Sequence, residues 1–246
     1  MSFRSLAGSF IRRVAERQGV HLVRLEKQFG IDPFIDARRL SHQPYRPLDN
    51  FFDVGANDGD TAVRARKCFP DLPIFSFEPY PATYELLMKR MEGCPHFTGV
   101  NLALGPKEAT LDLYVYEVST VNSFVPDMPF VRRRNLQATR LPVQCITLDA
   151  YCRTHGITHV GILKIDTEGF DLEVLRGAEE MLSRKAISFI YVEFLEIGPD
   201  RGGTNLLSID AFLKPFGYKF FTTYLDNIRI EDANVRRLPN ALFLKN

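Results

Sequence analysis

Short apolar runs alternate with stretches of helical periodicity along most of the chain, starting near residue 49. The nearly continuous apolar runs predict strands near 50–55, 73–78, 98–103, 160–166 and 187–194. Apolar residues three and four positions apart predict helices near 61–69, 81–92, 171–183 and 206–214. Strands that alternate with helices in this way are typical of a mostly parallel sheet covered on both faces, so we expect an α/β fold.

Two further strand-like segments, 111–115 and 141–146, precede the 160–166 strand. We expect them either to extend one edge of the sheet or to form a hairpin over a ligand site at its rim. Asp32-Pro33 and the proline-containing stretch 41–47 break any helix, which places a boundary near residue 48. The prediction is an N-terminal helical extension, residues 1–48, followed by a main domain, residues 49–246.

The extension mixes apolar and basic residues between positions 3 and 29. This mixture describes helices that pack on their own domain or on a second subunit, so a homodimer stays open. It also fits an interfacial helix, which leaves peripheral membrane contact open. The sequence contains no run of roughly eighteen apolar residues, the length that a transmembrane segment needs, and its N-terminus lacks the apolar core of a signal peptide. We therefore expect a soluble protein with no transmembrane segment.

Charge and cysteine content narrow the classes of partner and compartment. The 246 residues include 31 basic and 30 acidic side chains, a formal net charge of +1, which gives no general field to attract nucleic acid. We therefore expect no nucleic-acid partner. The four cysteines are scattered without a CxxC spacing, which favours reduced thiols over a zinc site or a disulfide framework. This pattern predicts a cytoplasmic protein.

The turn after the 50–55 strand is the first candidate binding site, in the sequence FFDVGANDGDTA. Gly55 and Gly59 permit backbone torsions and a close approach that a side chain would block. Thr61 or Asp60 is expected to cap the helix that follows, whose free N–H groups and positive dipole end suit a carboxylate or a phosphate. Such a turn fits a nucleoside-type ligand.

Glu78 ends the next strand, 19 residues after Gly59. An acid about 20 positions beyond a glycine turn is placed to accept hydrogen bonds from both hydroxyls of a ribose. Pro79 then ends the strand. The alternative is a surface glutamate beside purely structural glycines. The turn lacks the full GxGxxG pattern, which argues against a nicotinamide dinucleotide.

Acidic residues also follow two later strands. Asp166 and Glu168 come after the apolar run GILKI, and Glu193 ends the 187–194 run. Open parallel sheets bind ligands at the carboxyl ends of their strands. Asp166 and Glu168 could therefore bind a substrate hydroxyl, a ligand ammonium group or a divalent metal, although helix capping alone would also explain them. For Glu193 the alternative is a solvated acid at the edge of the sheet.

Segments across residues 48–196 resemble, in the same order, the FkbM family of S-adenosylmethionine-dependent methyltransferases: FFDVGANDGDTA, IFSFEPYPATYELL, GVNLALG, ITLDAYC, LKIDTEGFDLEVLRGA and IYVEF. The resemblance implies a Rossmann-like class I methyltransferase fold, with a mostly parallel seven-stranded sheet whose last strand is antiparallel. Residues 219–222 and 241–244 would form its closing pair. It also implies methyl transfer to a hydroxyl of a small-molecule or glycan acceptor, such as a sugar, a glycolipid or a polyketide-like natural product.

The resemblance assigns the cofactor contacts residue by residue. The methionine part of S-adenosylmethionine would lie among Asp53, Gly55, Ala56, Asn57 and Gly59, beside the helix start at Thr61. The ribose would lie at Glu78 and Pro79, and the adenine at Asn101, Leu102 and Ala103. A polar loop that could close over the cofactor contains Ser119, Thr120, Asn122 and Ser123, for which ordinary solvation is the alternative. Asp166 would face the cofactor's amino group or the acceptor.

A sugar hydroxyl is a good nucleophile only if its proton leaves as the new bond forms, which a carboxylate or a metal promotes. The candidate bases are Asp166, Glu168 and Glu193, and a divalent metal stays open. An amine or nucleic-acid methyltransferase is an alternative, but it normally has an Asn/Asp-Pro-Pro-aromatic turn where this chain has Asp166-Thr167-Glu168-Gly169. A nicotinamide oxidoreductase or a non-catalytic nucleotide-binding module is the remaining alternative.

Overall fold

The structure is a computed structural model that describes residues 28–42, 46–117, 119–126, 128, 131, 134–194, 204–231 and 234–245, without side chains at 225–231 and 234–238. The helices expected before residue 28 lie outside the described residues, so the dimer and membrane contacts expected of them stay predictions. Within the described ranges, no helix is long and apolar enough to cross a bilayer.

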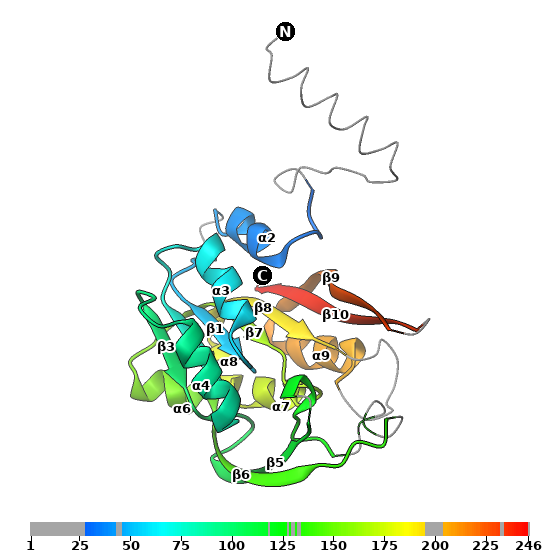
Figure 1. The fold of residues 1–246 in the computed structure, drawn as a ribbon. Helices are drawn as coiled ribbons and strands as arrows, with labels where there is room; N and C mark the ends of the chain where they lie inside the picture. Colours follow the sequence, from blue (N-terminus) through cyan, green and yellow to red (C-terminus); the bar gives the residue numbers. More distant parts are fainter. Residues whose placement is uncertain are drawn as a thin grey trace, which may run out of the picture.

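A seven-stranded sheet forms the centre of the fold (Figure 1). In spatial order its strands are β3 (Phe97–Val100), β2 (Ile74–Phe77), β1 (Phe51–Val54), β7 (Val160–Ile165), β8 (Ile187–Glu193), β10 (Asn234–Lys245) and β9 (Tyr218–Glu231). Neighbours from β3 to β8 pair in parallel, whereas β10 is antiparallel to both β8 and β9. This topology confirms the predicted α/β fold with an antiparallel last strand.

Helices cover both faces of the sheet (Figure 1). One face carries α2 (Pro33–Leu40), α3 (Asp60–Cys68) and α4 (Pro81–Arg90). The other face carries α6 (Leu148–Thr154), α7 (Asp171–Arg176), α8 (Glu179–Ser183) and α9 (Leu206–Leu213). Phe51 packs against the helices of the first face and Phe52 against those of the other face, because successive side chains of a strand point to opposite faces. Short 3₁₀ turns span Ser119–Val121 and Lys214–Phe216.

A separate three-stranded sheet branches off where the predicted 98–103 strand ends early (Figure 1). It contains β4 (Ala103–Leu104), β6 (Thr139–Ile146) and β5 (Ala109–Val115), with β5 and β6 antiparallel. The turn before it is held by Asn101, whose side-chain amide donates to the carbonyl oxygens of Glu78 (2.8 Å) and Pro79 (3.2 Å). The 111–115 and 141–146 segments therefore pair antiparallel with each other, as the strands of a hairpin do, although residues 116–138 separate them in place of a short turn. The alternative of an extended sheet edge is wrong.

The single helix predicted over 171–183 is wrong, because α7 and α8 are separated at Gly177. The Gly177 carbonyl accepts the backbone N–H of Asp149 (3.0 Å) instead of continuing the helix. The Asp149 carboxylate in turn accepts the N–H groups of Glu180 (2.8 Å) and Met181 (3.0 Å) in the first turn of α8. A residue on α6 thus ends one helix and begins the next.

Asp32-Pro33, predicted as a helix break, is the start of α2. The Asp32 carboxylate accepts the N–H groups of Phe34 (2.9 Å) and Ile35 (3.0 Å), and proline is well tolerated in a first helical turn. Phe34 packs edge-on against Phe51 of β1, with ring centroids 5.2 Å apart. Residues 33–40 therefore share the core of the main sheet, while the division near residue 48 stays a prediction.

Candidate functional site

A cavity of about 520 Å³ lies at the carboxyl ends of β1, β2, β7 and β8. Its wall contains the turn residues 55–58, then Glu78 and Pro79, then residues 166–168 and Glu193. Parallel strands end at the same edge of a sheet, so motifs separated by more than 100 residues meet in one place. The residues predicted from the glycine turn and from the later acids share this cavity.

The turn after β1 depends on a close approach between two backbones. Gly55 has a φ of 76°, and a Cβ there would overlap the carbonyl oxygen of Asp166 in the loop after β7. A side chain at this position is therefore excluded by both torsion and space. Asn57, two residues further along the turn, also has a positive φ, 47°, and lines the cavity. Its side-chain Oδ1 is buried and has no hydrogen-bond partner in the described part of the chain.

The predicted cap of α3 by Thr61 or Asp60 is wrong. The N-cap is Gly59, which has a φ of 95° and no side chain that could accept a hydrogen bond. Asp60 instead pairs with Arg90 of α4 (2.7 Å), and Thr61 lines the cavity from the first turn of α3. A glycine cap leaves the first N–H groups of α3 without a local side-chain acceptor.

Glu78 is a buried acid in the cavity wall, 7% exposed. Its Oε2 accepts the backbone N–H of Asn57 (2.8 Å), and its Oε1 accepts that of Tyr80 (2.9 Å). Burial raises the pKa of Glu78 despite these hydrogen bonds, which favour the charged form. The alternative of a surface glutamate is therefore wrong, and Glu78 connects the glycine turn to the end of β2.

Asp53 lies behind the cavity and not in its wall. It is fully buried on β1, where its Oδ1 is 3.0 Å from Nζ of Lys164 on β7. The ammonium group also donates to the carbonyl oxygen of Gly55 (3.2 Å) and lies 3.5 Å from Oδ2 of Asp166. Burial lowers the pKa of Lys164, but the carboxylates of Asp53 and Asp166 outweigh it and raise that pKa. Lys164 thus stays charged and orients Asp166.

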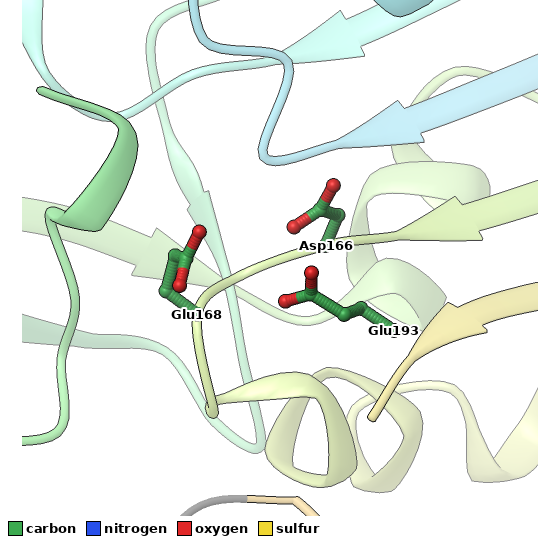
Figure 2. Close-up of side chains that lie close together, drawn as sticks. All are labelled: Asp166, Glu168 and Glu193. Atoms are coloured by element: carbon green, nitrogen blue, oxygen red, sulfur yellow. The ribbon is translucent and has the colours of Figure 1, made fainter. Parts of the chain in front are cut away.

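Asp166, Glu168 and Glu193 form a cluster of carboxylates (Figure 2). One oxygen of each lies within 4.8 Å of the others. The first two come from the loop after β7, and Glu193 is the last residue of β8. Glu193 is only 2% exposed, so the alternative of a solvated edge acid is wrong. Burial, reinforced by the neighbouring carboxylates, raises the pKa of Glu193 well above its usual value.

The loop that carries Asp166 and Glu168 is organised by Asp171, to which the sequence analysis assigned no role. The buried Asp171 carboxylate accepts from the N–H (3.0 Å) and hydroxyl (3.1 Å) of Thr167 and from the N–H of Gly169 (3.2 Å). Burial raises the pKa of Asp171 to about 6. The N-cap of α7 is Phe170, so helix capping does not explain Asp166 and Glu168.

The remaining predicted residues divide between the wall and its support. Leu102 and Ala103 line the cavity, as do three residues of the polar loop, Ser119, Thr120 and Asn122. Ser123 instead donates to the carbonyl oxygen of Glu168 (2.7 Å) and holds that loop against the acids. Asn101 and Gly59, like Asp53, lie outside the cavity wall; Asn101 holds the backbone of Glu78 and Pro79, and Gly59 begins α3.

The cavity wall also contains residues that the sequence analysis missed, among them Phe34, Arg64, Tyr191 and Asn240. Asn240 of β10 is paired with Glu193 of β8 across the sheet and is 5% exposed. No local pattern marks these residues, because each reaches the cavity through packing between distant segments. An asparagine inside the otherwise apolar end of a strand was the one available signal for Asn240.

Residues 53–220 match the sequence model of a family described as Methyltransferase FkbM domain. Hexuronic acid methyltransferase AglP of Haloferax volcanii is 27% identical over 176 residues, 70% of this chain and 67% of the relative. The 2-O-methyltransferase NoeI of Sinorhizobium fredii is 21% identical over 184 residues, 70% of this chain and 73% of the relative. A crystal structure of an FkbM methyltransferase from Methylobacillus flagellatus has 14% identity and a TM-score of 0.49, covering 96% of this chain and 70% of that one.

Proposed function

The chain belongs to the FkbM methyltransferase family, and on this premise we propose that it uses S-adenosylmethionine to methylate a hydroxyl of a sugar, glycolipid or natural product. The observation that supports the proposal is that one cavity contains both a site suited to a nucleoside and a site suited to a hydroxyl acceptor. A buried acid beside a glycine turn, Glu78, lies in the same wall as the carboxylates of Asp166, Glu168 and Glu193. The first suits a nucleoside, and the second suits a hydroxyl acceptor.

The chain's own residues fit the cofactor. The cavity, about 520 Å³, lies in the usual range for small-molecule sites, roughly 300–1,000 Å³. Each oxygen of Glu78 accepts one backbone N–H and has capacity for a further hydrogen bond, so both hydroxyls of a ribose can donate to it. The Oδ1 of Asn57 is buried and has no hydrogen-bond partner among the described residues, so it can accept a hydrogen bond from the ammonium group of the cofactor. S-Adenosylmethionine supplies an already activated methyl group.

With the methyl donor activated, the protein mainly has to align the acceptor oxygen, exclude water and receive a proton. Asp166 is our first candidate for the proton acceptor, because its side chain is 34% exposed and lines the cavity. Lys164, whose Nζ is 3.5 Å from Oδ2 of Asp166, holds it in place. Glu168 and Glu193 complete the acidic surface that a hydroxyl-rich acceptor would contact.

The relatives favour a hydroxyl acceptor over an amine or nucleic acid. One relative is a hexuronic acid methyltransferase, and another is a 2-O-methyltransferase. The loop after β7 reads Asp166-Thr167-Glu168-Gly169 and lacks the paired prolines expected for amine methylation. A cytoplasmic location belongs to the same proposal, supported by four free thiols at Cys68, Cys94, Cys145 and Cys152.

Calorimetric binding of S-adenosylhomocysteine and of NAD tests the proposal. We expect the first to bind and the second not to bind. Glu78→Ala should weaken binding of S-adenosylhomocysteine by roughly 1–3 kcal/mol, the worth of hydrogen bonds to a charged group. This corresponds to about 5- to 150-fold in Kd.

Glu85→Gln is the matched control, since Glu85 is an exposed acid on α4 outside the cavity wall. This variant should bind S-adenosylhomocysteine as tightly as the wild type does. Binding of NAD alone would replace the methyltransferase proposal with a nicotinamide-dependent one. Unchanged affinity in a folded Glu78→Ala variant would remove Glu78 from the ribose site. Acceptors can then be screened with radiolabelled S-adenosylmethionine against glycans and lipid-linked sugars.

A further inference from the structure

The end of β8 holds a buried acid whose second oxygen is not used. Glu193 is 2% exposed, and its Oε2 has no hydrogen-bond partner within the described ranges. A buried carboxylate oxygen without a partner is costly, since the group has given up its hydration. Lys164, the buried cation nearby, already contacts Asp53 at 3.0 Å and Asp166 at 3.5 Å. The arrangement calls for a further positively charged partner.

A second, independent observation comes from β10. Asn240 is 5% exposed, lines the same cavity and has an Oδ1 without a hydrogen-bond partner in the described part of the chain. It is paired directly with Glu193 in the sheet, and directly paired side chains lie on the same face about 5 Å apart. Two unpartnered oxygen atoms, one from a carboxylate and one from an amide, therefore adjoin the acidic cluster.

We propose that Asp166, Glu168, Glu193 and Asn240 bind one divalent cation of the hard class, such as Mg²⁺ or Mn²⁺. Carboxylate and amide oxygens are the ligands that hard cations prefer, and the set contains no sulfur or imidazole. Oxygens on opposite sides of one cation are about 4 Å apart for Mg²⁺ and about 5 Å apart for Ca²⁺. The carboxylate oxygens lie within 4.8 Å of one another, a separation that Ca²⁺ spans directly and that Mg²⁺ or Mn²⁺ would shorten by less than about 1 Å.

The cation has a defined use at this position. The four ligands come from one wall of the cavity, so the remaining coordination positions face its interior, where two neighbouring hydroxyls of an acceptor can enter. A hydroxyl bound to the cation would lose its proton more readily, and a carboxylate oxygen of the set that does not bind the ion could accept that proton. Only this role toward the acceptor rests on the proposed function; binding of the ion itself does not.

Mn²⁺ binding to the full chain, freed of metal with a chelator and measured by electron paramagnetic resonance without cofactor or acceptor, tests the proposal. We expect one Mn²⁺ per chain, displaced by Mg²⁺. Glu193→Gln and Asn240→Ala should each raise the Kd for Mn²⁺, the first by at least roughly tenfold because a direct ligand loses its charge. The exposed-acid variant Glu85→Gln should bind as the wild type does. If Glu193→Gln does not fold, Glu168→Gln replaces it.

Absence of saturable Mn²⁺ binding below about 1 mM would overturn the proposal. Folded Glu193→Gln and Asn240→Ala variants that both bind Mn²⁺ with the affinity of the wild type would also overturn it, because the ion would then bind elsewhere. If Glu193→Gln weakens S-adenosylhomocysteine and Mn²⁺ does not bind, the acids hold the ammonium group of the cofactor instead. If Mn²⁺ binds but S-adenosylhomocysteine does not, the proposed function fails while the cation site stands.

Discussion

The two acidic ends of the cavity are built differently. At the β1–β2 end, both oxygens of Glu78 accept backbone N–H groups, from Asn57 at 2.8 Å and Tyr80 at 2.9 Å. At the β7–β8 end, Glu193 is at least as deeply buried, yet its Oε2 has no hydrogen-bond partner among the described residues. Glu78 is held in place by backbone N–H groups of neighbouring residues, whereas Glu193 has an oxygen that is available to a ligand.

This difference assigns different work to the two ends. Fixed donors orient Glu78 before a ligand arrives, so little reorganisation is needed on binding, which is the condition for firm and specific recognition. The acids of the other end lie together, and mutual repulsion raises the cost of keeping them all charged. We infer that the β1–β2 end recognises one constant ligand, while the β7–β8 end acts on the reacting groups.

Asp166→Asn, at the β7–β8 end, should have the largest effect of the variants proposed for the two ends. Removal of the carboxylate should lower turnover by roughly 10²–10⁴-fold, the usual contribution of a general base, with a much smaller loss of stability. The side chain is partly exposed and Lys164 keeps its contact with Asp53, so the fold does not depend on it. Steady-state kinetics and thermal denaturation of the same preparation measure both effects. Equal losses of turnover and stability would make Asp166 a structural residue.

Gly55→Ala should distort the other end through overpacking and backbone strain. The added methyl group meets the carbonyl oxygen of Asp166 and forces strain on a residue with a φ of 76°. We expect a loss of about 2–4 kcal/mol in unfolding free energy, from left-handed strain and overpacking together. Gly156→Ala is the control, because Gly156 has a φ of 66° but nothing within 4 Å of an added Cβ.

Urea denaturation of both glycine variants separates the two contributions. The control should lose only about 1 kcal/mol, the cost of the left-handed torsion. Similar losses in Gly55→Ala and Gly156→Ala would show that the contact between the turn and the loop after β7 adds nothing.

Asp171→Asn should remove a pH-dependent part of the stability, beside a constant loss because the new amide NH₂ group faces an N–H donor of Thr167 or Gly169. Burial raises the pKa of Asp171 from 3.8 to about 6, so the folded chain holds this proton more tightly than the unfolded chain does. The stabilisation is complete below about pH 4 and is lost as the pH rises through about 6, a change on the order of 2–3 kcal/mol. Asparagine does not titrate, so the variant should lack this part of the pH dependence.

Chemical denaturation of wild type and Asp171→Asn from about pH 4 to about pH 7 measures the difference, in which slopes from other acids cancel. A parallel pH dependence in the two proteins would mean that Asp171 titrates alike in the folded and unfolded chain.

Local patterns in the sequence correctly predict one part of the site. The apolar runs of β1 and β2, the glycine turn and Glu78 lie within 28 consecutive residues, from Phe51 to Glu78. Strand periodicity, turn torsions and spacing are set by neighbouring residues, so they can be predicted from them. The same holds for Asp166 and Glu168, because a buried strand delivers them to its carboxyl end.

Two helix boundaries differ from the prediction because residues distant in the sequence determine them. The helix over 171–183 is broken because Asp149 of α6 takes the Gly177 carbonyl. The cap of α3 is Gly59, where an added Cβ would overlap the Leu87 side chain of α4, so a residue with a capping side chain does not fit there. Both predictions were reasonable for isolated segments, and both were overturned by contacts between elements.

The amino-acid order alone specified the alternation of strands and helices, the glycine turn and the acids that follow three strands. Tertiary structure alone placed Asp53 behind Lys164, set Asn240 beside Glu193, and brought Asp166 against Gly55. The physical reason is the range of the interactions involved. Backbone torsion and hydrophobic periodicity act over a few residues, whereas the pairing of strands far apart in the chain decides which buried polar groups meet and which are left for a ligand.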